Sequence, residues 1–132
     1  MHSVIRFCQM EESQMKIIAE RVNEIIPGLF EDVTPATRVE NLFSFSLSEK
    51  DEWRDHHDEV LEILKKISPL ISPGNIYDGE LEIDLCVHVE NGDCDRFITE
   101  LPLSPELIQV LFENRIRFTT SIYNAAVFQL DE

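Results

Sequence analysis

The chain has 132 residues, 43% of them hydrophobic and 28% charged, which is typical of one folded domain and excludes a disordered chain. Its 26 acidic residues outnumber 11 basic ones, and the formal net charge of −15 argues against binding to nucleic acid or to anionic membranes and favours a basic protein partner. No run approaches the roughly 18 apolar residues of a membrane span, and the early acidic residues leave no room for a signal-type apolar segment, so we expect a cytoplasmic location.

The first third of the chain predicts a strand, a helix and a second strand. "SVIRFC" (3–8) is typical of a strand. Pro27 and Gly28 should end the helix that follows, and 39–48, with Phe43 and Phe45 on one side, alternates like a half-buried strand. The helix before Pro27 shows the i, i+3, i+4, i+7 spacing of an amphipathic stripe, carried by Met15, Ile18, Ala19, Val22, Ile25 and Ile26.

A second helix is expected between this strand and position 68. Ser48 and Asp51 form a variant capping box at its start. Pro69, Pro73 and Gly74 follow the predicted end.

The segment "ELEIDLCVHVE" (80–90) alternates strictly and predicts an antiparallel strand with one face in water. "NGDCD" (91–95) should turn the chain and 96–103 should return as its hairpin partner. One face is apolar, and the other is predicted to carry polar side chains in water: Glu80, Glu82, Asp84, Cys86, His88 and Glu90.

The last elements are a helix and a strand. Ser104 is a good N-cap and Pro105 a good first helical residue, and 117–128 is typical of a strand. The resulting order, β-α-β-α-β-β-α-β, predicts a single α+β domain with about three helices on one face of a mostly antiparallel sheet.

"DEWRDHHDEV" (51–60) places adjacent histidines among carboxylates, which raises the question of a metal site. On a helical wheel, however, His56 and His57 fall at opposite edges of the apolar stripe, while most of the acids of this segment point away from both. Both histidines are therefore expected to be partly buried and hydrogen-bonded. The acids that share the opposite face are Asp51, Asp55, Asp58 and Glu62.

One metal-binding alternative remains open on this helix. Glu52, His56 and Glu59 have i, i+4 and i, i+3 spacing and could meet on one edge. Zinc would still need ligands from a second element, so we expect neither a metal nor another cofactor.

Sequence patterns of enzymes are missing. GxSxG, HExxH, GxxxxGK[ST] and GxGxxG do not occur, and "ENGDCD" lacks the order of an EF-hand. The three cysteines show no CxxC spacing and are expected to be free thiols, while nearby acids should raise their pKa values. The sequence thus favours a protein that is not an enzyme.

The stretch 79–123, together with the helix that starts at Trp53, resembles a family of small bacterial proteins of uncharacterised function. The residues that carry the resemblance are Trp53, the alternating strand with its hairpin return, "SPEL" (104–107) and Ile122-Tyr123. The general profile is also similar to that of bacterial immunity proteins, which neutralise a toxin domain. This second similarity implies a binding function and no particular residues.

We therefore expect an immunity-type protein that covers the basic groove of a toxin domain, plausibly a nuclease, encoded by the neighbouring gene. The alternatives are a metal-binding protein or metal-dependent enzyme using Glu52, His56 and Glu59, or a cytoplasmic adaptor whose acidity only aids solubility. The acidic face Asp51, Asp55, Asp58 and Glu62 is the second choice for the interface. The first choice is the row around the strand at 80–90, made of Glu80, Glu82, Asp84, Glu90, Asp93 and Asp95.

Overall fold

The computed structural model describes residues 1–35, 41–72, 80–89 and 101–124. Within them the order of elements is β-α-β-α-β-α-β, and the predicted α+β class is confirmed. The bounds are β1 His2–Cys8, α1 Glu12–Ile25, β2 Phe43–Ser48, α2 Trp53–Ile71, β3 Glu80–Val89, α3 Pro105–Glu113 and β4 Ile116–Asn124.

The four strands form one sheet in the order β2-β1-β3-β4. β1 lies between β2 and β3 and is antiparallel to both, whereas β4 pairs with β3 in parallel. The sheet is therefore mostly antiparallel, as predicted. The hairpin partner expected at 96–103 falls largely outside the described residues, and 101–104 has no strand structure.

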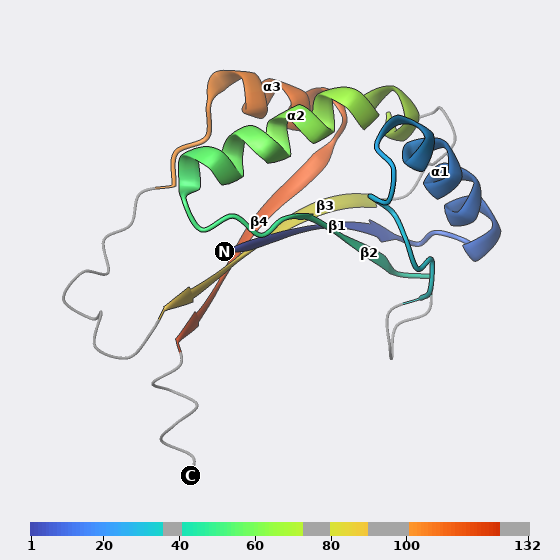
Figure 1. Ribbon diagram of the computed structural model, residues 1–132, viewed down its shortest axis with the longest axis horizontal. Coiled ribbons are helices and arrows are strands. Elements are labelled where there is room, and N and C mark those ends of the chain that lie inside the picture. Colours follow the sequence, from blue (N-terminus) through green and yellow to red (C-terminus); the bar gives the residue numbers. More distant parts are fainter. Residues whose placement is uncertain (36–40, 73–79, 90–100, 125–132) are drawn as a thin grey trace, which may run out of the picture.

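All three helices cover the same face of this sheet (Figure 1). The strands turn alternate residues toward them, so that Ile5, Phe7, Phe43 and Ile83 are almost completely buried. No described helix covers the opposite face, and we call it the open face of the sheet. None of the helices described is both long and apolar enough to cross a membrane.

The first and last helices follow the predicted signals. α1 buries Met15, Ile18, Ala19 and Val22 of the predicted stripe. Ile25 is 46% exposed and Ile26 is the C-cap, so the stripe is wrong at Ile25 in the last turn. At α3, Ser104 is the N-cap and its Oγ accepts a hydrogen bond from the Leu107 N–H at 3.1 Å. The start of α3 therefore follows the local capping rule, and the first turns of α1 pack as predicted.

The predicted start of α2 is wrong. Ser48 belongs to β2, where its Oγ accepts a hydrogen bond from the Lys50 N–H at 3.3 Å, and the N-cap is Glu52, which makes no side-chain cap bond. The helix also continues past Ser68 to Ile71, with Pro69 in its last turn. Tertiary burial of Ile67 and Ile71 outweighs the weak local signals at the end of the helix.

Candidate functional site

The acidic row on β3 lies on the open face, as predicted, but two arginines from neighbouring strands compensate it. Arg6 of β1 places Nη1 3.0 Å from Asp84 Oδ2 and 3.4 Å from Glu82 Oε1. Arg117 of β4 places Nη2 2.9 Å from Glu80 Oε2 and 3.7 Å from Glu82 Oε2. The sheet register causes this, because both arginines lie directly beside Glu82 on their strands.

Burial distinguishes these carboxylates from surface acids. Asp84 is only 3% exposed and also accepts a hydrogen bond from Ser121 Oγ at 2.9 Å. The Glu82 side chain is 19% exposed and that of Glu80 65%. The part of β3 expected in water is therefore half-buried, and Asp84 is held by the sheet. The other predicted members, Glu90, Asp93 and Asp95, lie outside the described residues.

The second acidic surface lies on and just before α2 and is open to solvent. We call Asp51, Asp55, Asp58 and Glu62 the α2 acidic face. The side chains of Asp51, Asp58 and Glu62 are 95%, 67% and 70% exposed, and Asp55 is exposed as well. All four acids are exposed, as predicted, although Asp51 precedes α2 and does not lie on it.

Two cations near the α2 acidic face pair with it at the protein surface. The N-terminal ammonium of Met1 lies 3.2 Å from Asp51 Oδ1, and Lys66 Nζ lies 3.2 Å from Glu62 Oε1 in an i, i+4 pair. Exposed pairs of this kind contribute little and exchange readily with water. The carboxylates of this face therefore remain available to another molecule.

A hollow of about 270 Å³ adjoins this face. Trp53 forms part of it and is fixed by a hydrogen bond from its Nε1–H to the Pro102 carbonyl at 2.9 Å. Such a hollow offers an aromatic surface beside a carboxylate. Its lining is Trp53, Arg54, His57, Asp58, Pro102, Leu103 and Ser104.

His57 secures the segment that precedes α3. Its Nε2 accepts a hydrogen bond from the Ser104 N–H at 3.0 Å, and its Nδ1 lies 3.3 Å from Asp58 Oδ1. The residue is 7% exposed. This histidine thus joins α2 to the wall of the hollow.

His56 points to the other side of α2 and is completely buried. Its Nδ1–H donates to the Lys50 carbonyl at 2.8 Å, and its Nε2 accepts from Ser3 Oγ at 2.5 Å. Burial lowers the pKa of His56 below its usual value, although the bond to the Lys50 carbonyl works in the opposite direction. The ring is therefore a neutral connector between α2, β1 and the β2–α2 loop.

These contacts argue against the metal-binding alternative. Both nitrogens of His56 are engaged, and Glu59 Oε2 lies 3.4 Å from Lys50 Nζ. Glu52 is exposed at the N-cap. In the described part of the chain no three His, Cys, Asp or Glu side chains are grouped as metal ligands would be.

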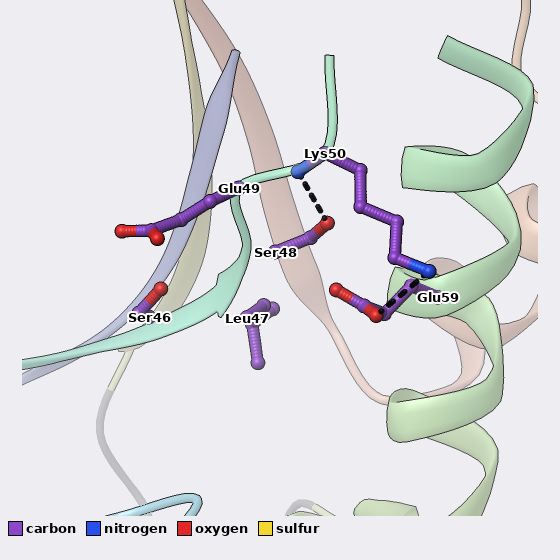
Figure 2. A pocket seen from close by; sticks show the side chains of 6 residues that line it. All are labelled: Ser46, Leu47, Ser48, Glu49, Lys50 and Glu59. Carbon is purple, nitrogen blue, oxygen red and sulfur yellow. Dashed lines mark hydrogen bonds and ion pairs between the residues drawn. The ribbon is translucent and has the colours of Figure 1, made fainter. Parts of the chain in front are cut away.

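A second hollow, of about 610 Å³, lies between the end of β2 and α2 (Figure 2). Lys50 extends toward α2 and pairs with Glu59, whereas Glu49 points away from them. The hollow therefore presents a neutralised ion pair and serine hydroxyls. Its lining is Ser46, Leu47, Ser48, Glu49, Lys50 and Glu59.

The described thiols are poor nucleophiles. Burial and the carboxylates of Glu82 and Glu80 raise the pKa of Cys8, and burial and Asp84 raise that of Cys86. The predicted direction is confirmed for both. Cys94 lies outside the described residues.

Sequence reasoning missed the two arginines and the hollow beside Trp53. The stretch between Lys66 and Arg96 contains no Lys or Arg, but Arg6 and Arg117 approach it from strands far away in the chain. Their alternation within β1 and β4 places them on the polar side, yet only the register shows which acids they meet.

Comparison of the chain with protein-family models, curated proteins and solved structures gave no match. Both resemblances, to the small bacterial family and to immunity proteins, therefore stay predictions. Any assignment of function has to rest on the surfaces and contacts of the chain itself.

Proposed function

We propose that this chain is an immunity-type binding protein that neutralises a basic toxin domain of the nuclease kind through the α2 acidic face. The observation that carries the proposal is the position of this exposed face beside the hollow at Trp53. A nuclease must be basic where it holds phosphates, so a row of carboxylates can occupy its groove in place of the substrate.

The α2 acidic face suits this role better than the row on β3. Asp84 and Glu82 are half-buried or buried and are held by Arg6 and Arg117. A partner would have to break these cross-strand pairs before it gained any contact with them. The acids of α2 need only release exposed cations.

The hollow at Trp53 offers a site for a desolvated contact, which long-range charge attraction does not provide. Long-range attraction accelerates association, but tight binding depends on a few desolvated contacts. A lysine or arginine of the partner would pack its aliphatic stem on Trp53 and bring its charge to Asp58, an arrangement that adds a cation–π contact. Arg54 also lines the hollow and would have to turn outward.

The test is association with the protein encoded by the neighbouring gene. We expect the wild-type chain to bind it and to inhibit its activity. Asp55→Lys/Asp58→Lys should slow association about tenfold at low salt and weaken its dependence on salt. Stopped-flow fluorescence of Trp53 would measure both.

The matched control is Glu20→Lys/Glu24→Lys on α1, which makes the same change in net charge at two exposed helical acids. This variant should keep most of the wild-type association rate. Equal slowing by both variants would assign the effect to net charge and remove the α2 acidic face from the proposal. A purified pair that does not associate would refute the function itself.

A further inference from the structure

β4 forms one edge of the sheet, and it differs from the other edge in what it exposes. Ile122 is 58% exposed and Tyr123 42%. On β2, by contrast, the apolar residues Phe43, Phe45 and Leu47 are buried and the exposed positions are serines. A free strand edge with exposed apolar side chains is a template for pairing with another strand.

α3, which precedes β4, also exposes apolar side chains. The helix contacts both α2 and β4 and lies on the β4 side of the molecule (Figure 1). Ile108 is 52% exposed and Phe112 82%, one turn apart.

The orientation of α3 shows where this pair points. Leu107 and Leu111 face the core, and Glu106 faces α2, where Lys65 Nζ lies 2.6 Å from its Oε1. At 100° per residue, Ile108 and Phe112 then lie on the flank turned away from α2. They therefore lie toward the outer edge of β4, which has no strand neighbour among the described residues.

The distribution of charge indicates that the partner at this edge is a second copy of the chain. Two copies of a chain with a net charge of −15 repel each other over most of their surfaces. β4 is an exception, because Arg117 is its one charged residue. The pair Ile108 and Phe112 is uncharged too. This edge is thus a place where two copies can meet without opposing carboxylates.

The sequence of β4 is also complementary to itself. An antiparallel pairing centred on Thr120 places Phe118 opposite Ile122 of a second copy on the helix side. On the open face it places Thr119 opposite Ser121, and Arg117 opposite Tyr123. Apolar, hydroxyl and cation–aromatic pairs are all favourable across antiparallel strands.

We propose that β4 and the exposed flank of α3 form the interface of a homodimer, in which two β4 strands pair antiparallel about Thr120 and join the sheets into one. The flank of α3 is needed, because a stable interface buries about 1,200 Å² or more in total, which a single strand edge does not supply. The interface is separate from the α2 acidic face, so both can be occupied together.

Sedimentation over a range of concentrations tests the dimer. The wild-type chain should dimerise at micromolar concentrations, and Ile122→Glu should raise the dissociation constant at least about tenfold, because it introduces a charge at the paired edge. Ile17→Glu on α1 is the matched control, since Ile17 is 48% exposed and the charge change is the same. It should leave the constant unchanged.

A cross-link tests the register. In a chain with Cys8, Cys86 and Cys94 replaced by Ser, Thr120→Cys should form an intermolecular disulfide on mild oxidation, because directly opposed Cβ atoms are about 5 Å apart. Ser46→Cys on the β2 edge should not. A chain that stays monomeric at about 100 µM would overturn the proposal. So would a dimer that resists Ile122→Glu, or one that cross-links through Ser46→Cys. None of these outcomes would affect binding through α2.

Discussion

At the scale of single residues, Asp84 shows how a carboxylate expected in water becomes part of the fold. It is 3% exposed, and Arg6 and Ser121 both contact it. A buried charge is tolerated only when its partners compensate the lost hydration. Asp84 is therefore a residue that stabilises the sheet rather than one that is free to contact a partner.

Replacing Asp84 by Asn should lower the free energy of unfolding by about 2 kcal/mol, because Arg6 loses its shortest ion pair while it stays in place. Glu80→Gln is the control, since the Glu80 side chain is 65% exposed, and it should cost about 0.5 kcal/mol or less. Urea unfolding measures both. Similar losses for the two variants would contradict the structural role of Asp84.

The burial of His56 predicts how the free energy of unfolding depends on pH. Burial lowers its pKa in the folded chain, so the unfolded chain binds a proton more readily between the folded pKa and about 6.5. The stabilising contribution of neutral His56 is therefore complete above about pH 6.5 and is lost as the pH falls through the lowered folded value.

The measurement is the difference in the free energy of unfolding between wild type and His56→Leu, by urea, at pH 7.5 and pH 5.5. The difference should be smaller at pH 5.5, because only the wild type takes up this proton on unfolding. The carboxylates titrate in both proteins, so taking the difference between wild type and variant cancels their contribution to the pH dependence of the free energy of unfolding. A difference that grows on acidification would mean that the folded pKa of His56 is raised.

At the scale of elements, local patterns predict what local forces determine. The stripe of α1 from Met15 to Val22, the cap of α3 and the strands at β1 and β3 all rest on patterns within a few residues, and all are confirmed. The opposite orientations of His56 and His57 were also predictable, since they follow from helix geometry alone.

The features that the sequence did not predict depend on contacts between residues distant in the chain. The start of α2 at Trp53 is fixed in part by the hydrogen bond from Trp53 to Pro102 and by the one from His56 to the Lys50 carbonyl. The parallel neighbour of β3 could not be foreseen from the alternation of its residues, because either a parallel or an antiparallel neighbour preserves the two faces. The ion pairs of Arg117 with the β3 acids follow from that neighbour, and those of Arg6 follow from the antiparallel register of β1 with β3.

At the scale of the whole molecule, the helices gather on one face of the sheet (Figure 1) and the charge is distributed unequally. Cross-strand arginines compensate the acids of β3. The excess negative charge therefore resides on surfaces such as the α2 acidic face, where it attracts a basic partner and also repels itself within the fold.

This excess predicts opposite effects of salt on stability and on association. Raising NaCl from 20 to 300 mM shortens the screening length from roughly 20 Å to below 10 Å. The reduced self-repulsion should raise the free energy of unfolding by about 1 kcal/mol, as measured in urea, while association with the basic partner slows.

The variant that tests binding through the α2 acidic face also tests the predicted effect of salt on stability. Asp55→Lys/Asp58→Lys carries less negative charge and should gain less stability from NaCl than the wild type does. If salt instead lowered the stability of the wild type, the ion pairs of Arg6 and Arg117 would outweigh the repulsion among the exposed acids, because screening weakens attraction and repulsion alike. The sign of the salt effect therefore reports which set of charges dominates the folded chain.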